Sequence, residues 1–402
     1  MPLHVGRPNI GDRDRFYRRL DQIFSSGWLS NDGPMVREFE EAIASISRAR
    51  NCVAVCNGTV ALQLAAKALA LSDQVVIPSF TFVATAHAIR WQGITPTFAD
   101  IEGCYHAIGP KSVSRVVGSQ TSGVIAVRTW GLPIDDSALE NVTASANLAL
   151  IFDSAHALAC GWKDGPRRLF GGAEVLSFHA TKFLNTFEGG AILTDDDALA
   201  DRLRLMRNFG FAGFDRVELL GLNGKMSEPC AAMGLTNLEF LNEIVQRNTE
   251  NHQAYSRAVA HLPGISLLQP PAGYEWNHQY VVALVNPSCA LDRDSLVQVL
   301  LAENVLARRY FFPGVHKMEP YVSEETHEPP SLPVTERACE SVMILPTGTA
   351  VQPNDATQIG EILERAIDRA DDVLGVLQKA KELTGAKPRA AVEPLGSFMN
   401  RT

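Results

Sequence analysis

Short apolar segments alternate with longer amphipathic ones through the first half of the chain. The apolar segments are typical of buried strands, and several of the segments between them have the composition of helices. The predicted strands are residues 51–56, 74–79, 95–101, 123–131, 148–155, 174–180 and 190–196, and the predicted helices are residues 37–47, 58–71 and 81–93. Because parallel strands need crossover connections that cover both faces of a sheet, we expect a large α/β domain with a mostly parallel mixed sheet.

The pattern becomes helical at about residue 226 and stays so to residue 262, with Leu235, Leu238 and Leu241 on one broad face. A segment of this length can connect two structural units. Beyond it the chain alternates again, and the sequence predicts a strand at 278–287 and helices at 292–305 and 356–380. We therefore expect residues 1–250 to form the large domain, residues 251–383 a smaller C-terminal α+β domain, and residues 384–402 a flexible tail.

The composition is that of an ordinary globular protein, with 402 residues, 46% hydrophobic and 20% charged. A net charge of −9 argues against a nucleic-acid partner, because phosphate contacts need a basic face. The seven cysteines are odd in number and contain no CxxC pair, so we expect neither disulfides nor a metal site, and we expect a cytoplasmic protein. No apolar stretch approaches the ~18 residues of a membrane span, so no membrane association is expected.

Lys182 lies in an otherwise apolar stretch between a predicted strand and the Glu-Gly-Gly bend at 188–190. Burial disfavours the ammonium form and lowers its pKa, which makes the amine available as a nucleophile toward a carbonyl carbon. A lone lysine in such a place is more often a surface residue whose stem covers apolar neighbours. Lys182 alone leaves both interpretations open.

Asp153 ends the predicted strand at 148–155. In α/β proteins, ligand-binding groups are presented at the carboxyl ends of strands. A carboxylate there can pair with a cation such as the protonated ring nitrogen of pyridoxal phosphate. The alternative, about equally frequent for one such residue, is a cap on the following helix.

Asn57 and Gly58 turn a predicted strand directly into a helix at Thr59. The N–H groups of a first helical turn, the helix dipole and a threonine hydroxyl together suit a phosphate group. Ser177, five residues before Lys182, can supply a second hydroxyl to the same phosphate. The same residues also suit an ordinary turn and cap, so this signal is weak when taken alone.

Phe82 comes just after another predicted strand and can stack on a flat cofactor ring, although a core phenylalanine is more common. The combination is more specific than any of its members. A strand-end acid, a phosphate-binding turn, an aromatic ring and a flanked lysine together predict a pyridoxal phosphate site.

Seven segments carry a resemblance to a known family, in that family's order: GWLSNDGPMVREFE, NGTVALQLA, PSFTFVATAHAI, FADIE, FDSAHALACG, SFHATKFLNTFEGGAILTDD and GLNGKMSEPCAAMGL. Over roughly residues 1–380 the chain resembles the sugar aminotransferases of the DegT/DnrJ/EryC1/StrS family. The resemblance implies a pyridoxal phosphate-dependent enzyme of fold type I, the fold of aspartate aminotransferase.

The resemblance also implies a role for each matching residue. Lys182 would bind the aldehyde carbon of pyridoxal 5'-phosphate as a Schiff base and carry the proton during transfer. Asp153 would pair with the ring nitrogen, and His156 would lie near the substituted edge of the ring, on which Phe82 would stack. The residues implied to hold the phosphate are Gly58, Thr59, Ser177 and, reaching the neighbouring subunit, Asn223. A two-fold homodimer with shared active sites is therefore expected.

The implied reaction is amine transfer, since the dehydratase branch of the family replaces the lysine with histidine. L-glutamate is the expected donor, with pyridoxamine phosphate as the intermediate, and the expected acceptor is a dTDP-linked keto sugar. The segment from Ser177 resembles the subgroup that acts on dTDP-linked keto-6-deoxyhexoses. We favour dTDP-4-keto-6-deoxy-D-glucose, giving dTDP-4-amino-4,6-dideoxy-D-glucose, and keep the 3-keto isomer as the alternative.

The substrate-binding candidates are Trp28, Asn31, Trp130, Arg309, Tyr310, His316 and Lys317. Trp130 belongs to a segment, residues 128–131, where relatives often carry His-x-Tyr-Gly near the sugar. The cations of residues 308–317, which include Arg308, suit an anionic diphosphate. An ordinary solvated basic turn is an equally frequent alternative.

Two other function classes share part of this sequence pattern. A nicotinamide-dependent oxidoreductase would share the alternating pattern, but no GxGxxG follows an early strand. A non-catalytic regulatory protein of the same fold would lack the lysine or carry a DNA-binding segment, and the sequence shows neither feature.

Overall fold

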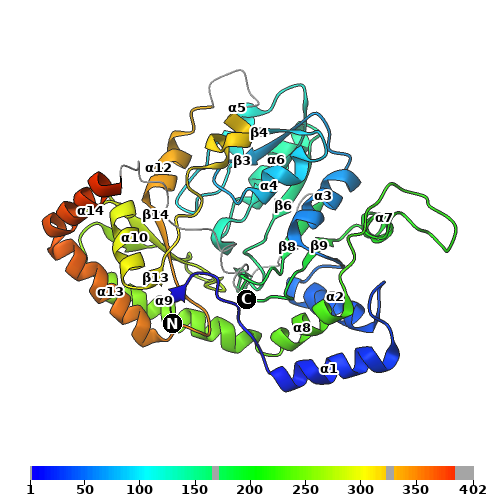
Figure 1. Cartoon of the computed structure of the whole chain (residues 1–402). Helices are drawn as coiled ribbons and strands as arrows, with labels where there is room; N and C mark the ends of the chain where they lie inside the picture. The colour runs from blue at the N-terminus through cyan, green and yellow to red at the C-terminus, as the bar shows by residue number, and fades with distance from the viewer. Residues whose placement is uncertain (1, 165–171, 323–329, 385–402) are drawn as a thin grey trace.

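The computed structural model describes residues 2–164, 172–322 and 330–384. Its largest sheet has seven strands in the order β2-β9-β8-β6-β5-β3-β4 (Figure 1). The bounds are β2 Asn51–Val55, β3 Gln74–Pro78, β4 Thr95–Ala99, β5 Thr121–Val127, β6 Ala149–Asp153, β8 Ala173–Ser177 and β9 Gly190–Thr194. Only β9 runs against its two neighbours, and the remaining pairs in this sheet are parallel. The predicted mostly parallel mixed sheet is therefore confirmed.

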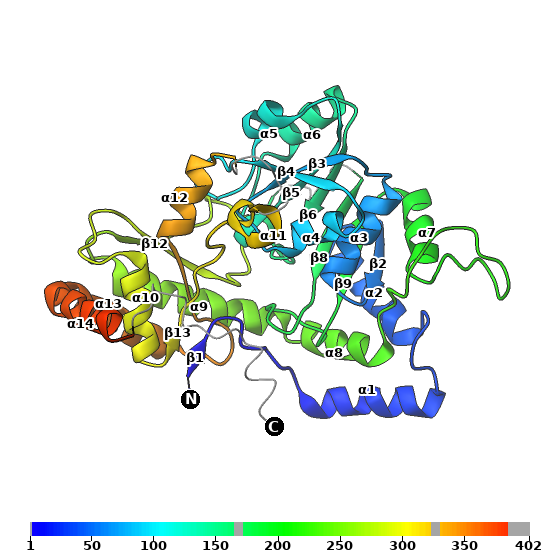
Figure 2. The same ribbon diagram turned by 45° about the horizontal axis from the view of Figure 1, so that its top comes forward.

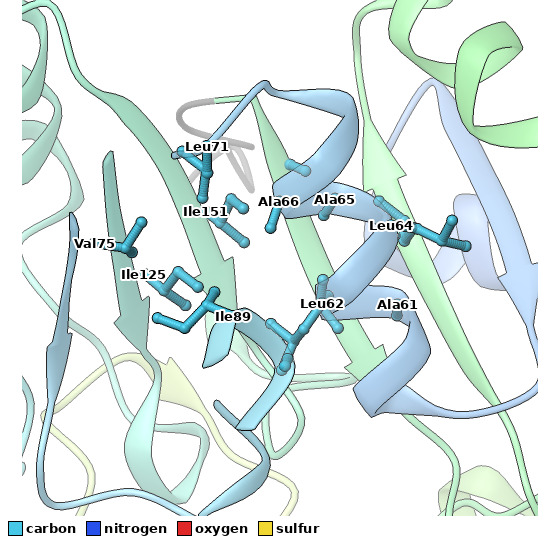
Figure 3. Packing of buried hydrophobic residues seen from close by; sticks show 14 of the residues in the cluster. Ala61, Leu62, Leu64, Ala65, Ala66, Leu71, Val75, Ile89, Ile125 and Ile151 are labelled. Carbon is cyan, nitrogen blue, oxygen red and sulfur yellow. The ribbon is translucent and has the colours of Figure 1, made fainter. Parts of the chain in front are cut away.

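Helices cover both faces of this sheet (Figures 1 and 2). Because side chains alternate along a strand, Val75 and Ile125 pack on one face against α3 and α4 (Figure 3), whereas Leu176 and Leu193 pack on the other against α2 and α8. The helices of this half are α1 Arg13–Ser26, α2 Pro34–Ser47, α3 Gly58–Ala68, α4 Ala84–Arg90, α5 Pro110–Val116, α6 Asp136–Ser145, α7 Asp197–Met206 and α8 Glu228–Leu238.

The helical segment predicted at residues 226–262 is two helices, α8 and α9, because the backbone leaves helical geometry at Phe240 (ψ 10°). Helix α9 extends into a second core. That core surrounds a three-stranded antiparallel sheet, β10-β12-β14, and is flanked by α10, α13 and α14. The bounds are α9 Leu241–Val259, β10 Ile265–Leu267, β12 Val281–Val285, α10 Arg293–Ala302, β14 Val342–Leu345, α13 Pro353–Asp368 and α14 Ala370–Thr384.

The predicted boundary at residue 250 lies within α9, which packs in one core at Ile244 and in the second core at Ala254. Two segments cross this boundary, since Val315, Tyr321 and Leu332 pack in the core of the large sheet and the start of the chain packs with the second core. Strand β1 (Leu3–His4) pairs in parallel with β13 (Val305–Leu306), so the start of the chain belongs with the second core. The predicted tail at 384–402 lies outside the described residues apart from Thr384.

The remaining short elements are β7 Gly161–Trp162, β11 Tyr274–Glu275, α11 Glu319–Val322, α12 Pro333–Ser341 and the 3-10 turns η1 Thr129–Gly131 and η2 Val315–Lys317. Nowhere in the described ranges is a helix both long and apolar enough to cross a bilayer.

An aromatic cluster joins the two halves. Trp130, at the end of the large sheet, packs with Phe80, Tyr280 and Phe311 in one buried group. The indole Nε1 of Trp130 donates a hydrogen bond to His106 Nδ1 at 3.1 Å. Burial lowers the pKa of His106 to about 4, so this ring is neutral in the folded protein at pH 7.

Stability should therefore depend on pH through His106. Between pH 6.5 and 4 the unfolded chain takes up a proton at this residue that the folded chain does not, so stability falls as the pH falls. In His106→Asn, we expect the loss of unfolding free energy from pH 7 to pH 5 to be smaller by about 1 to 2 kcal/mol. Urea unfolding at fixed protein concentration measures it, with the exposed His261→Asn as control. An unchanged pH dependence in the His106 variant would contradict this account.

Candidate active site

Asp153 is the last residue of β6, at the carboxyl edge of the large sheet, and is buried. Its Oδ2 accepts a hydrogen bond from Thr85 Oγ1 of α4 at 2.8 Å, and its Oδ1 accepts one from the Ala155 N–H at 3.2 Å. Burial raises the pKa of Asp153, and these two bonds and the charge of Lys182 oppose that effect. The carboxylate is thus held in one orientation where a cationic ligand group would stabilise it. Thr85 was not predicted, although its hydroxyl is the one polar group on the buried face of α4.

Lys182 lies five residues beyond the end of β8 and is partly buried. Its backbone N–H donates to the His179 carbonyl at 2.8 Å, which closes a turn. Burial lowers the pKa of the ammonium, while the nearby Tyr310 and Asp153 act in the opposite direction. This placement favours a desolvated amine over a surface lysine that extends into solvent.

His156, three residues after Asp153, lies in a stack of aromatic rings. Its ring is nearly parallel to those of Trp130 (11°) and Phe311 (1°), each at 6.2 Å, and Tyr280 meets it edge-on at 4.9 Å. Burial, followed by the charge of Lys182, places the pKa of His156 well below its ordinary value. Its Nδ1 is buried and has no hydrogen-bond partner within the described chain. The ring is therefore neutral and has one polar atom left for a ligand.

Trp130 is not at a substrate-exposed position, which corrects the prediction from sequence. The side chain is fully buried, and its carbonyl oxygen accepts a hydrogen bond from Trp276 Nε1 at 2.7 Å. Arg128 of the same segment is also buried and pairs with Asp136 at 2.7 Å. Burial of this large apolar ring is energetically favourable. From within the core, the Trp130 ring stacks on the ring of His156.

The start of α3 packs tightly against the ends of β8 and β9. A Cβ placed on Gly58 would lie 3.0 Å from Ser177 Cβ, and one placed on Gly190 would lie 2.6 Å from the Asn57 carbonyl carbon. The side chain of Asn57 caps the helix, while the N–H groups of Gly58 and Thr59 precede its first intrahelical hydrogen bond. The structure thus brings the predicted phosphate-binding residues Gly58, Thr59 and Ser177 together.

A cavity of about 340 Å³ lies beside Tyr310. Phe82 is 61% exposed and lines it, as do Arg309 and Tyr310 from the predicted substrate-binding set. The full lining is Thr81, Phe82, Val83, Val297, Ala307, Arg308, Arg309, Tyr310, Phe311, Phe312 and Met318. His316 and Lys317 do not line this cavity.

His316 is buried, which corrects its prediction as a cation for the substrate. Its Nδ1 lies 2.5 Å from Ser79 Oγ, and burial and the charge of Lys317 lower its pKa, so the ring is neutral at pH 7. Lys317 is paired with Glu336 at 2.9 Å. His316 therefore carries no positive charge at pH 7, and the charge of Lys317 is balanced by the Glu336 carboxylate.

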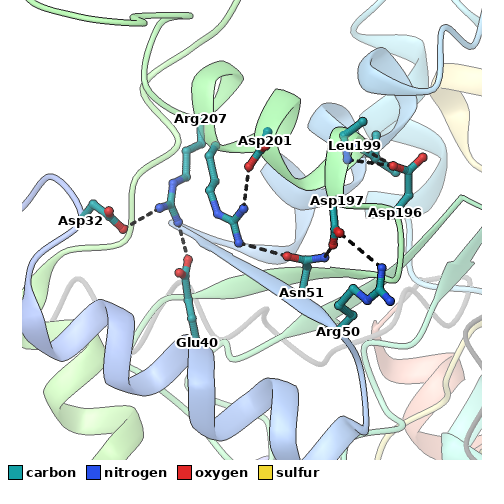
Figure 4. A network of polar contacts seen from close by, with 11 residues as sticks. Asp32, Glu40, Arg50, Asn51, Asp196, Asp197, Leu199, Asp201 and Arg207 are labelled. Atoms are coloured by element: carbon teal, nitrogen blue, oxygen red, sulfur yellow. Dashed lines mark hydrogen bonds and ion pairs between the residues drawn. The ribbon is translucent and has the colours of Figure 1, made fainter.

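Trp28 and Asn31 are joined to each other rather than to Lys182, since Trp28 Nε1 donates to the Asn31 carbonyl at 3.3 Å. Asn31 borders a cavity of about 180 Å³ that shares no lining residue with the cavity beside Tyr310. The buried Arg207 holds this region in place, since it pairs with Asp32 at 2.8 Å and with Glu40 at 2.5 Å (Figure 4). The structure therefore does not bring Trp28 and Asn31 to Lys182 of the same chain.

Asn223 is exposed in the segment that follows α7. It forms an antiparallel bridge with Asn208, and the carbonyl of the next residue, Gly224, accepts from the Cys56 N–H at 2.8 Å. Asn223 thus lies one residue from a contact with the strand that leads into the phosphate cradle, with its side chain open to a neighbouring molecule. No cluster of three potential metal ligands occurs in the part of the chain that the structure describes.

Comparisons with known proteins match most of the chain. Residues 11–364 match the family model of the DegT/DnrJ/EryC1/StrS aminotransferase family. The dTDP-4-amino-4,6-dideoxy-D-glucose transaminase of Shigella dysenteriae is 32% identical over 322 residues, covering 80% of this chain and 88% of the relative. The Escherichia coli protein of the same name is 28% identical over 369 residues, covering 90% and 98%.

Solved structures give the same result. The crystal structure of DesI, determined in the presence of its TDP-sugar product, is 44% identical and superposes with a TM-score of 0.89 over 94% of this chain and 96% of DesI. PseC of Helicobacter pylori, an aminotransferase of pseudoaminic acid biosynthesis, shares the fold at 21% identity, with a TM-score of 0.84 over 92% of this chain and 100% of PseC. Because the family model matches residues 11–364 and a relative is 32% identical over 80% of the chain, this chain belongs to the DegT/DnrJ/EryC1/StrS aminotransferase family.

Proposed function

We propose that the chain transfers an amino group from L-glutamate to C4 of dTDP-4-keto-6-deoxy-D-glucose, giving dTDP-4-amino-4,6-dideoxy-D-glucose, with pyridoxal phosphate as cofactor. The observation that carries this proposal is the desolvated Lys182 amine in the field of the buried Asp153 carboxylate. We further propose a cytoplasmic location, which agrees with seven free cysteines.

The residues fit pyridoxal phosphate in three respects. A β-carbon on Gly58 would crowd Ser177 at 3.0 Å, and the first turn of α3 together with the hydroxyls of Thr59 and Ser177 suits a phosphate. Asp153 forms no ion pair within the described residues and suits a protonated ring nitrogen. The orphaned Nδ1 of His156 suits a polar substituent on such a ring. When bound, the cofactor supplies an electrophilic aldehyde carbon and a ring that withdraws electrons.

The chain's own residues then perform distinct tasks. The amine of Lys182 is uncharged over a wider pH range than that of an exposed lysine, so its Nζ can take a proton from the donor's α-carbon in the first half-reaction and deliver one to C4 of the sugar in the second. The carboxylate of Asp153, oriented by Thr85, would hold the ring nitrogen of the cofactor and would favour its protonated form through its negative charge. The neutral His156 and the rings behind it exclude water from one side of the site.

We propose a two-fold homodimer with shared active sites. The exposed position of Asn223 supports this, since its side chain is free to reach the phosphate cradle of a second copy. Trp28 and Asn31 lie on the same part of the surface as the segment of Asn208 and Lys225. In a dimer they would approach the substrate of the partner rather than that of their own chain.

The choice of sugar rests on the relatives. Two of them are named dTDP-4-amino-4,6-dideoxy-D-glucose transaminase, and the 44% identical DesI was crystallised with a TDP-sugar product. Transamination is reversible, so relatives named after the amino sugar support the conversion between the keto sugar and the amino sugar in either direction.

The test is to incubate the purified protein and pyridoxal phosphate with L-glutamate and, separately, the dTDP-linked 4-keto and 3-keto 6-deoxy sugars. We expect formation of 2-oxoglutarate and an amine located at C4 by NMR, with ping-pong kinetics. Protein without added sugar is the control for uncoupled release of 2-oxoglutarate. Amination at C3 alone would contradict the proposed substrate, and no amination of either sugar would contradict the proposed function.

A further inference from the structure

Two threonine hydroxyls form a continuous line of hydrogen bonds that ends at Asp153. Thr81 Oγ1 lies 2.9 Å from Thr85 Oγ1, and Thr85 Oγ1 lies 2.8 Å from Asp153 Oδ2. All three side chains are buried. Thr81 also lines the cavity beside Tyr310, so this line of bonds connects the wall of that cavity to the strand-end acid.

The direction of these hydrogen bonds follows from the chemistry of the groups. An ionised carboxylate only accepts, so the single hydroxyl hydrogen of Thr85 is directed to Asp153. The Thr85 oxygen is then left as an acceptor, and Thr81 must donate its own hydroxyl hydrogen to it. Buried hydrogen bonds that point the same way along a chain polarise one another. The Thr81 hydroxyl therefore strengthens the bond that Thr85 donates to Asp153.

The Asp153 carboxylate is fixed from two different segments of the chain. Thr85 of α4 donates to Oδ2, and the N–H of Ala155, in the segment after β6, donates to Oδ1 at 3.2 Å. Rotation of the carboxylate would break both bonds. Burial raises the pKa of Asp153, and the hydrogen bond from Thr85 is the largest of the effects that oppose this rise.

The segment that carries the two hydroxyls also carries Phe82. Its ring is 61% exposed and lines the same cavity, and its carbonyl accepts from the Thr85 N–H at 3.1 Å. Thr81 and Thr85 are four residues apart, about one helical turn, so their hydroxyls meet on the inner side of the segment. Residues 81–85 thus combine an exposed aromatic ring with a buried pair of hydroxyls.

We propose that Thr81 and Thr85 are positioning residues that make the site select a ligand ring with a basic nitrogen, because they hold the Asp153 carboxylate charged and in one orientation. The inference rests on the cofactor of the proposed function. A hydroxyl pair that only fills the core would contribute equally to the binding of any ring of the same shape. A pair that acts through the carboxylate contributes only when the ring has a nitrogen with which Asp153 can pair.

The test compares two ligands of the purified full chain after removal of cofactor. One is pyridoxal phosphate, and the other is its 1-deaza analogue, in which a C–H group replaces the ring nitrogen. Dissociation constants are measured by fluorescence quenching in the absence of amino donor and sugar. Their ratio reports what the ring nitrogen contributes to binding. Asp153→Asn is the reference variant and should remove most of the preference for pyridoxal phosphate.

For Thr85→Val, which keeps the shape and removes the hydroxyl, we expect the preference for pyridoxal phosphate to fall about tenfold, while the affinity for the analogue changes less than about threefold. Thr81→Val, one bond further from the carboxylate, should lower the preference about threefold. Thr85→Ser keeps a hydroxyl and should retain the wild-type preference. Thr143→Val is the matched control and should leave it unchanged, because Thr143 is buried in α6 and donates to the Leu139 carbonyl of its own helix.

An unchanged preference in Thr85→Val would overturn the inference. Equal losses of affinity for both ligands would also overturn it, because the threonines would then only support the fold, and so would a wild-type protein that binds the two ligands equally tightly. Should Thr85→Val fail to fold, Thr81→Val decides, and no change of preference there would overturn the inference. Because these measurements need no turnover, a protein that shows the expected ratios but aminates no sugar would contradict the proposed function alone.

Discussion

The site depends on the removal of water from one amine. Lys182 lies where burial lowers its pKa, and its only opposing neighbours of note are a phenol and a carboxylate. Burial and these two neighbours act in opposite directions on the charge of Lys182. A buried ammonium without them would cost free energy of folding, and a fully solvated ammonium would be a poor nucleophile. The charge of Asp153 opposes the lowering of the Lys182 pKa, and the carboxylate itself is fixed by a hydrogen bond from Thr85 of α4. The strand-end position of Asp153 and the turn that presents Lys182 follow from the sheet topology.

Contacts between the two cores keep these segments in register. Residues 276–280 precede β12 of the second core, and three of their side chains bind backbone groups of the large domain. Trp276 donates to the Trp130 carbonyl, Asn277 Nδ2 donates to the His156 carbonyl at 2.9 Å, and Gln279 Oε1 accepts from the Phe183 N–H at 3.3 Å. A relative movement of the cores would therefore disturb the loops on either side of Lys182. The second core therefore holds the segments around His156 and Lys182 in position, and the chain that follows its strand β13 supplies Arg308 and Tyr310 to the cavity wall.

The sequence predicted the large sheet well because its strands are short apolar runs whose side chains face two cores, and this signal is local. Asp153 and the turn at Asn57 and Gly58 could be singled out for the same reason, since each lies at the end of a strand, whereas Lys182, five residues beyond β8, was singled out by its place before the Glu-Gly-Gly bend. Helix α1, Arg13–Ser26, was not predicted: its composition is strongly polar, and Ile23 is its one buried residue in the described chain, so no run of core residues marked it. The pairing of Leu3–His4 with Val305–Leu306 joins residues about 300 positions apart and has no local signal.

Side-chain burial was the least predictable property of the site. Trp130 and His316 are a large aromatic ring and a basic residue in segments rich in polar or aromatic neighbours, so sequence could not tell that both face inward. Their orientation is set by partners distant in sequence, His106 and Ser79 respectively. Likewise, the pairing of Arg309 with Asp294, a residue of α10, joins two separate segments and has no local signal.

The most direct test of the account is chemical identification of the amine that binds the cofactor. The protein is reconstituted with pyridoxal phosphate, reduced with borohydride, digested and analysed by mass spectrometry, alongside Lys182→Ala. The account predicts that the cofactor's mass is fixed to the peptide containing Lys182, that other lysines such as Lys225 remain unmodified, and that the variant carries no label. Labelling of a different lysine, or an equal yield of label in Lys182→Ala, would contradict it.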